Sequence, residues 1–242
     1  MLRVHSFESF GAHEGPGLRF VVFLQGCMFK CLYCHNPDTI PLVGGEETTP
    51  EEIMRQVLDT KPYFGSKGGF TVSGGEPMLQ AKDLIPLFRM LKAEGIHIAV
   101  DTNGFPRNDD VKEMIELADL FLVDIKQINN DLHKKLTGQS NENTLKLISY
   151  LEEHQKQMWI RYVLLTGYTD NPDDMREIGK RYGQFKHIER LEILPYHELG
   201  IYKYEELGMK YELEGIPMTT HEQAQAAKAV FDDYFAKVVI RG

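Results

Sequence analysis

Cysteine is scarce in this chain of 242 residues: it occurs three times, always within residues 27–34. An odd number with no distant partner excludes a disulfide framework. Long apolar runs are missing as well, because the run at residues 20–24 has the length of a strand, whereas a membrane span needs about 20 residues. Residues 1–8 lack the apolar stretch of a signal peptide. We therefore expect a cytoplasmic protein whose thiols stay reduced.

Basic residues are also few relative to acidic ones. The chain has 36 acidic and 27 basic residues, giving a net charge of −9, and no segment carries a basic stripe. Binding to nucleic acid depends on clustered Lys and Arg, so the surface as a whole is a poor match for duplex nucleic acid. No linker rich in Gly, Ser or Pro interrupts the sequence, and we expect one domain over residues 1–242.

The three cysteines, Cys27, Cys31 and Cys34, have the spacing C-x3-C-x2-C. A 4Fe–4S cube is usually held by four cysteines. Three thiolates leave one iron open to a ligand, as in catalytic rather than structural metal sites. Two other interpretations stay open: a Cys3His zinc site completed by His35, and an electron-carrying or structural metal module without catalysis. An electron carrier needs neither an open iron nor a cofactor pocket.

Strand-like runs alternate with helical patterns, which is typical of parallel strands joined by crossover helices. Strands are expected near residues 18–24, 69–73, 97–101, 120–124, 158–165 and 188–194, and helices near residues 50–59, 81–94, 110–117, 141–154, 172–182 and 221–234. Thr49 and Glu52 have the spacing of a capping box. The six units predict an α/β fold in the form of a partial (β/α)6 TIM-like barrel, with a doubly wound open sheet as the competing architecture.

Polar motifs occur where these strands end. The carboxyl ends of parallel strands share one face in α/β folds, and active sites are built there. The cysteine loop leaves the first strand and Arg161 lies within the fifth. The other strand ends carry Ser73-Gly74-Gly75-Glu76-Pro77, Asp101-Thr102-Asn103-Gly104, Asp124-Ile125-Lys126 and Pro195-Tyr196-His197. The pattern therefore predicts one site built from scattered motifs.

The Gly74-Gly75 pair and Glu76 each allow two interpretations. The glycines either let a ligand approach the backbone closely or form a turn that needs a positive φ. Glu76 either accepts a hydrogen bond from an ammonium group or lies in the first turn of a helix, where its charge suits the helix dipole.

Asp101 and Asp124 end apolar runs, where a carboxylate needs a cation or hydrogen-bond donors. Lys126 can pair with one of them or hold a ligand carboxylate, and a ligand ammonium group or a metal cation can also meet them. Arg161 has a planar guanidinium that suits carboxylate recognition, or it bridges Asp101 or Asp124. His197 follows an apolar run and is a candidate ligand contact.

With Tyr33 before the last cysteine and Gly74-Gly75-Glu76-Pro77 further on, the chain resembles the radical S-adenosylmethionine (SAM) family. Along almost its whole length it is similar to the activases of glycyl-radical enzymes. Residues 36–69 contain no cysteine, which favours the pyruvate formate-lyase branch over activases with an inserted ferredoxin-like segment. The supporting runs are His5-Ser6-Phe7-Glu8-Ser9, Gln25-Gly26-Cys27, Tyr33-Cys34-His35-Asn36, Asp101-Thr102-Asn103-Gly104-Phe105, Trp159-Ile160-Arg161-Tyr162 and Leu194-Pro195-Tyr196-His197-Glu198-Leu199-Gly200.

The resemblance implies a partial (β/α)6 barrel in which Cys27, Cys31 and Cys34 hold a 4Fe–4S cluster. It implies a monovalent-cation site, for Na+ or K+, formed by Asp101, Thr102 and Asp124. It also implies contacts to SAM from Tyr33, Cys34, His35, Gly75, Asp124, Ile125, Lys126, Arg161 and His197.

The same resemblance implies the reaction and the partners. Flavodoxin or ferredoxin would supply one electron, SAM would be cleaved to methionine and a 5′-deoxyadenosyl radical, and that radical would take a hydrogen from a glycine of pyruvate formate-lyase. The protein is expected to be a monomer without nucleic-acid or membrane partners. The alternatives are an activase of another glycyl-radical enzyme and a small-molecule radical SAM enzyme. Glu14 stands where the activase pattern has Asp, a change that affects expected contacts to the protein substrate.

Overall fold

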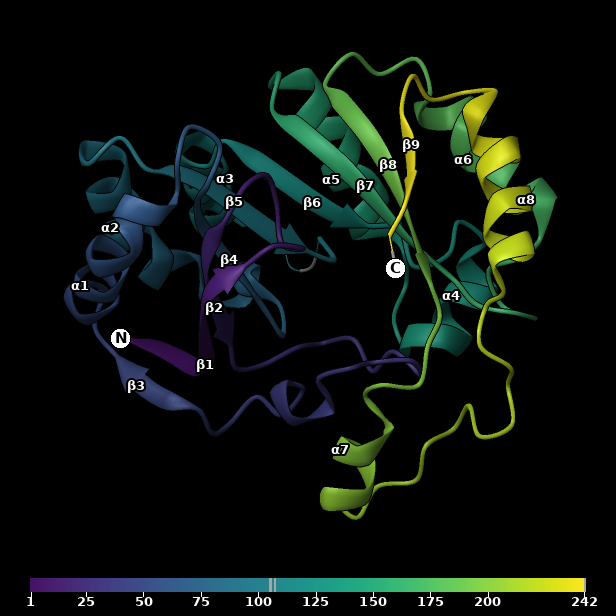
Figure 1. Cartoon of the computed structure of the whole chain (residues 1–242), viewed down its shortest axis with the longest axis horizontal. Coiled ribbons are helices and arrows are strands. Elements are labelled where there is room, and N and C mark those ends of the chain that lie inside the picture. The colour runs from purple at the N-terminus through teal and green to yellow at the C-terminus, as the bar shows by residue number, and fades with distance from the viewer. Residues whose placement is uncertain (105, 107, 242) are drawn as a thin grey trace. The chain divides into compact units, whose positions relative to one another are not determined.

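Parallel strands joined by helices make up the fold, as the alternation in the sequence predicts (Figure 1). The computed structural model describes residues 1–104, 106 and 108–241. Phe105, which belongs to one of the quoted motifs, lies outside the described residues. Residue contacts divide the chain into a first unit, Met1–Met28 with Thr39–Leu122, and a second unit, Phe29–Asp38 with Val123–Gly242. The cysteine loop changes unit after Met28, so Cys27 belongs to the first and the other two cysteines to the second.

In the first unit, the strands lie next to one another in the order β3-β1-β2-β4-β5, and β2, β4 and β5 are mostly buried. The strand β1 pairs antiparallel with β2 and β3, whereas β2, β4 and β5 are parallel. Helix α2 packs against α1, α3 and β5. The bounds are β1 (Leu2–Gly11), β2 (Arg19–Leu24), β3 (Glu46–Thr48), β4 (Gly69–Gly74) and β5 (His97–Thr102), with α1 (Pro50–Thr60), α2 (Ala81–Ala93), α3 (Asp109–Leu117) and the short 3-10 helices η2 (Lys61–Tyr63) and η3 (Pro77–Gln80).

Strand β6 (Leu120–Asp124) begins in the first unit and ends in the second. In the second unit the order continues as β7-β8-β9, with β8 parallel to both neighbours. Helix α8 packs on β8, β9 and α6 (Figure 1). The bounds are β7 (Gln157–Leu164), β8 (Ile188–Pro195) and β9 (Val238–Ile240), with α4 (Asn130–Thr137), α5 (Glu142–Glu153), α6 (Pro172–Tyr182), α7 (Ile201–Glu206) and α8 (His221–Asp232), while the 3-10 helix η1 (Pro37–Thr39) crosses the unit boundary.

The predicted fold class is confirmed: the chain is α/β, with a mostly parallel sheet that is not closed. Each expected strand and helix is present within a few residues of its expected bounds. The capping box at α1 is confirmed, since Thr49 accepts from the Glu52 amide and Glu52 accepts from the Thr49 amide. No helix in the described residues has both the length and the apolar character to cross a membrane.

Some elements were not expected from the sequence. Strand β1 carries Ser6 and Glu8 and is partly exposed along its middle, so it lacks the alternation that marks a half-buried strand. Strands β3 and β9 have three residues each, and α7 has six, which is too short for a helical period to be read. Helix α4 was missed because most of its side chains are polar.

Candidate functional site

The Gly74-Gly75 turn follows β4 in the first unit and packs directly on the backbone that leads to Cys27. Gly74 has a φ of 107°, and a Cβ there would overlap the backbone of Leu24. A Cβ on Gly75 would overlap the carbonyl of Gly26. The Gly75 amide donates to Leu24 O at 2.8 Å, so backbones meet without room for side chains. The turn interpretation of this motif is therefore confirmed at Gly74.

Glu76 is fully buried and binds groups of the protein itself. One carboxylate oxygen accepts from Met78 N at 2.9 Å and from Thr102 Oγ1 at 2.6 Å, and the other accepts from Asn103 N at 2.8 Å. Burial raises the pKa of Glu76 to about 8, although the three donors favour the charged form. Glu76 thus caps η3 and joins the end of β4 to the end of β5.

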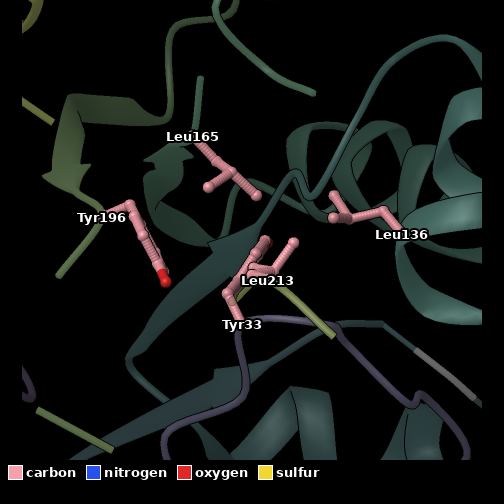
Figure 2. Packing of buried hydrophobic residues seen from close by; sticks show 5 residues of the cluster. All are labelled: Tyr33, Leu136, Leu165, Tyr196 and Leu213. Atoms are coloured by element: carbon pink, nitrogen blue, oxygen red, sulfur yellow. The ribbon is translucent and has the colours of Figure 1, made fainter. Parts of the chain in front are cut away.

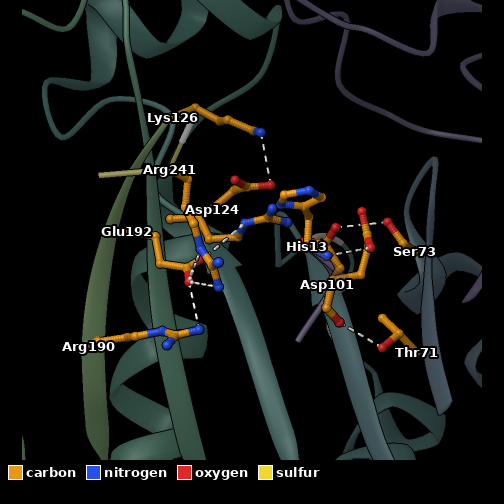
Figure 3. Close-up of polar contacts among 11 residues, drawn as sticks. His13, Thr71, Ser73, Asp101, Asp124, Lys126, Arg190, Glu192 and Arg241 are labelled. Carbon is orange, nitrogen blue, oxygen red and sulfur yellow. Dashed lines mark hydrogen bonds and ion pairs between the residues drawn. The ribbon is translucent and has the colours of Figure 1, made fainter. Parts of the chain in front are cut away.

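The end of β5 places Asp101, Thr102 and Asn103 among polar partners in the first unit. Asp101 accepts a hydrogen bond from Ser73 Oγ at 2.8 Å (Figure 3). The side-chain amide of Asn103 donates to Cys27 Sγ at 3.5 Å. A cation at Asp101 and Thr102 stays a prediction. No group of three or more His, Cys, Asp or Glu side chains in the described residues is arranged to hold a single metal ion.

The Glu14 turn precedes β2 and is fixed by Arg19, which the sequence analysis did not single out. Arg19 is fully buried, and its guanidinium donates to Pro16 O at 3.0 Å. Thr71 donates from its hydroxyl to Glu14 O at 2.7 Å. Gly15 has a φ of 132° and lies against the Arg19 side chain. Burial lowers the pKa of Arg19 to about 10, so Arg19 stays charged at neutral pH.

In the second unit, Asp124 and Lys126 follow β6 and form an ion pair. Lys126 Nζ lies 2.9 Å from Asp124 Oδ2 (Figure 3). Burial is the largest single influence and lowers the pKa of Lys126, but Asp124, Tyr33 and Cys31 together outweigh it and raise that pKa well above its usual value. Ile125 between them is buried, and its amide donates to Arg161 O at 3.0 Å. The pairing of Lys126 with Asp124 is thereby confirmed.

Arg161 lies beside Glu192, a fully buried carboxylate that the sequence analysis missed. Arg161 Nε is 3.7 Å from Glu192 Oε2, while Arg190 and Arg241 approach the other oxygen at 2.8 and 3.0 Å (Figure 3). The parallel register of β7 and β8 places Arg161 opposite Glu192. The sequence offered one signal for this pair, since both residues lie in strands that it predicts; the register that aligns them comes from the structure. Arg161 therefore does contact a carboxylate, that of Glu192, which was not among the partners that the sequence analysis expected, Asp101 and Asp124.

The cysteine loop of the second unit is anchored in a hydrophobic cluster. Tyr33 packs with residues from α4, from the chain after β7 and from the segment around α7, namely Leu136, Leu165, Tyr196 and Leu213 (Figure 2). Backbone bonds from Lys30 N to Thr137 O and from Leu32 N to Leu136 O, at 2.8 and 2.9 Å, attach the loop to α4. Lys126 Nζ lies 5.5 Å from the Tyr33 ring centroid, and burial raises the pKa of Tyr33. Tyr33 is therefore held as a neutral aromatic group.

None of the three cysteines forms a disulfide within the described residues, and all three are partly exposed. Burial raises the pKa of Cys34, so in the metal-free loop that thiol is protonated at neutral pH. Iron would displace the proton, since a coordinating thiol is deprotonated outright. Each thiolate of a 4Fe–4S cube binds a different iron, so three thiols on a short, anchored loop fit such a group without converging on one point.

His35, next to Cys34 in this loop, and His197 lie ring against ring, with the ring planes tilted by 39°. Their ring centroids are 4.3 Å apart, and His35 Nε2 lies 3.1 Å from His197 O. Burial, together with the neighbouring His197, lowers the pKa of His35. The second unit thus brings His35 together with His197, and Tyr33 together with Lys126, which pairs with Asp124.

Known proteins resemble this chain in sequence and in fold. A model of the radical SAM superfamily matches residues 21–178. The pyruvate formate-lyase 1-activating enzyme of Escherichia coli strain K12 is 42% identical over 240 residues, which cover 98% of each chain. The pyruvate formate-lyase-activating enzyme of Staphylococcus aureus strain USA300 is 44% identical over 232 residues, covering 93% of this chain and 92% of that protein.

Solved structures agree with this likeness. The crystal structure of a domain of a pyruvate-formate lyase-activating enzyme from Bacteroides vulgatus matches with a TM-score of 0.61 and 27% identity, covering 72% of this chain and 99% of that one. Streptococcus suis SuiB bound to the precursor peptide SuiA matches with a TM-score of 0.67 and 18% identity, covering 93% of this chain and 49% of that one. At that identity the second likeness shows the fold alone.

Proposed function

The chain belongs to the radical SAM superfamily, and on that premise we propose that it activates pyruvate formate-lyase by generating a glycyl radical on that enzyme. The observation that carries the proposal is the 42% identity to an activating enzyme over 98% of both chains. Membership of the superfamily implies a 4Fe–4S cluster and SAM as cofactors. Residues 36–69 contain no cysteine, and this favours the pyruvate formate-lyase branch over activases with an inserted ferredoxin-like segment.

Cys27, Cys31 and Cys34 are proposed as the cluster ligands, and the whole of residues 1–242 as one catalytic domain. When bound, the cluster and SAM supply an electron and a 5′-deoxyadenosyl radical that removes hydrogen from a glycine. The protein itself binds and orients the cluster and SAM and keeps water out of the site. Glycine is the natural target because it has no side chain that blocks access to Cα.

The SAM contacts are proposed from the family resemblance, and the charges of three of these residues agree with them. Lys126 stays protonated beside Asp124, and Arg161 stays charged, so both cations suit the carboxylate of SAM. Asp124 suits its ammonium group, and Asp101, Thr102 and Asp124 are proposed to hold Na+ or K+. The remaining proposed contacts come from Tyr33, Cys34, His35, Gly75, Ile125 and His197. Of these, the adjacent rings of His35 and His197 offer aromatic surface to a ligand.

The partners are proposed on the same basis. Pyruvate formate-lyase presents the glycine, flavodoxin or ferredoxin delivers the electron, and the activase works as a monomer without nucleic acid or a membrane. Three cysteines without a disulfide in the described residues support a place in the cytoplasm, where thiols stay reduced. Glu14 is proposed to face the protein substrate from a turn whose backbone is fixed by Arg19 and Thr71.

The test is anaerobic reconstitution with iron and sulfide, chemical reduction, and addition of SAM and pyruvate formate-lyase. We expect 5′-deoxyadenosine by chromatography and a glycyl radical by electron paramagnetic resonance, with Cys31→Ala as the cluster-free control. Absence of 5′-deoxyadenosine in the wild type refutes the radical SAM activity. Its formation without a radical on pyruvate formate-lyase refutes the partner alone and leaves another glycyl-radical enzyme or a small molecule as the substrate.

A further inference from the structure

The short helix α7 binds the loop that carries Cys31 and Cys34. Tyr204 donates its hydroxyl to the carbonyl of Cys34 at 3.0 Å. The neighbouring Lys203 donates to Asn36 Oδ1 at 2.9 Å and pairs with the Asp38 carboxylate at 3.0 Å. Two consecutive residues of one helix therefore hold the last cysteine and the residues that follow it.

The segment before α7 holds the same loop at His35. A Cβ on Gly200 would lie 2.8 Å from His35 Cα, so glycine is required for this close approach. The His197 ring lies against the His35 ring, and the His197 carbonyl lies 3.1 Å from His35 Nε2. The loop is thus contacted at three successive positions, from Cys34 to Asn36.

Helix α7 is itself fixed to the second unit. Tyr204 is buried, and its ring meets that of Tyr211 edge-on at 4.9 Å. Tyr211 shares a hydrogen bond of 2.8 Å with Tyr196, which belongs to the hydrophobic cluster around Tyr33. In contrast, Tyr202 on the same helix is 55% exposed. The two tyrosines of α7 therefore differ in role although they are two residues apart.

We propose that His197, Gly200, Lys203 and Tyr204, here named the α7 clamp, hold the cysteine loop in the conformation that binds the cluster and so slow the loss of the cluster. Tyr204 and Lys203 act as positioning residues, because they bind the loop backbone at Cys34 and the polar side chains that follow it. A loop that is already ordered loses less conformational entropy when its cysteines bind iron. The inference rests on the proposed function through one point, that Cys31 and Cys34 are cluster ligands.

The first experiment uses the metal-free protein and needs no cofactor. Amide hydrogen exchange is measured over residues 31–38 in the wild type, in Tyr204→Phe and in Tyr202→Phe. Tyr204→Phe removes one hydroxyl and keeps the ring, so we expect exchange at residues 31–38 to become about threefold to tenfold faster, the factor that the loss of one hydrogen bond gives. Tyr202→Phe, on the exposed side, is expected to exchange as the wild type does.

The second experiment reconstitutes these three proteins and Lys203→Met anaerobically and follows the release of iron to a ferrous chelator. We expect release to be about threefold to tenfold faster from Tyr204→Phe, with Lys203→Met changed in the same direction and Tyr202→Phe unchanged. Equal release and equal exchange in Tyr204→Phe and the wild type overturn the clamp. A wild type that takes up no iron overturns the proposed function instead, and hydrogen exchange still decides whether α7 orders the loop.

Discussion

The two units fix their candidate residues in opposite ways. In the first, a single buried acid, Glu76, is surrounded by uncharged donors from Met78, Thr102 and Asn103. In the second, buried charges meet charges of the other sign, as Lys126 meets Asp124 and Glu192 meets arginines. A buried acid without a cation can escape its desolvation cost by taking a proton, whereas a buried ion pair is held by its partner. The stability that depends on Glu76 in the first unit should therefore change with pH. The stability that depends on the ion pairs of the second unit should change when one charge is removed.

The comparison is tested most strongly by Glu192→Ala. The substitution leaves Arg190 and Arg241 without the carboxylate they share, and breaking a buried ion pair costs about 3 to 5 kcal/mol. We expect the free energy of unfolding to fall by about 3 kcal/mol, the lower end of this range, because the three arginines that face Glu192 keep some exposure to water. The measurement is the free energy of unfolding in denaturant. Asp232→Ala, which removes the partly exposed partner of Lys228, is the control and should cost at most about 1 kcal/mol. Equal losses in the two variants contradict the contrast drawn here.

Glu76→Gln tests the first unit. The pKa of Glu76 is raised to about 8 in the folded protein from an ordinary value of 4.5. The folded state therefore binds more protons than the unfolded state between these values, and stability falls as pH rises from about 4.5 to about 8. Gln cannot titrate, so the variant should lose this slope. It should also lose about 1 to 3 kcal/mol at low pH, because its amide NH2 faces a backbone N–H that needs an acceptor. Unfolding midpoints measured from pH 5 to 9 give both quantities, and a slope that persists in the variant assigns it to another group.

His133 offers the opposite pH response within the second unit. Burial lowers its pKa below the ordinary value, and its Nδ1 lies 2.7 Å from Gln139 O. The unfolded state then binds more protons than the folded one, so stability contributed by neutral His133 is lost as pH falls through about 6.5. We expect His133→Asn to flatten the acid side of the stability profile, by at most about 1 kcal/mol. His154→Asn, at an exposed helix end, should leave the slope intact. If His154→Asn flattens it equally, burial is not the cause.

The sequence analysis recovered the strands and helices that position the site. Strands β2 and β6 contain continuous apolar runs, and β4 contains Phe70, Thr71 and Val72, residue types that favour strands. Helices α1, α2 and α6 carry clear start or stop residues. The cysteines and strand-end motifs were found for the same reason: their types and spacing are visible without coordinates. The family resemblance then supplied the function.

What was missed depends on pairs of residues that are distant in sequence. Arg19 and Thr71 are 52 residues apart, and Arg241 and Glu192 are 49 apart, so no local pattern marks either pair. Buried charges are unlikely candidates from composition alone, since Arg and Glu are mostly exposed. Tyr204 lies on a six-residue helix, and its bond to Cys34 spans 170 residues. Side-chain pairing between segments, rather than local propensity, is the information that the sequence did not reveal.

We also expect a small shift in the reduction potential of the cluster in Asn103→Ala. The Asn103 side-chain amide donates to Cys27 Sγ at 3.5 Å, and hydrogen bonds to cluster sulfurs help to set the potential. A donor stabilises the extra negative charge of the reduced cluster, so its removal should make the potential more negative. A bond worth about 0.5 to 1.5 kcal/mol corresponds to roughly 20 to 60 mV for one electron. The backbone amide of residue 103 still binds Glu76 in the variant, so the contact between the ends of β4 and β5 is kept. A redox titration followed by electron paramagnetic resonance measures the shift, and an unchanged or higher potential means that an uncharged donor does not tune the cluster from the first unit.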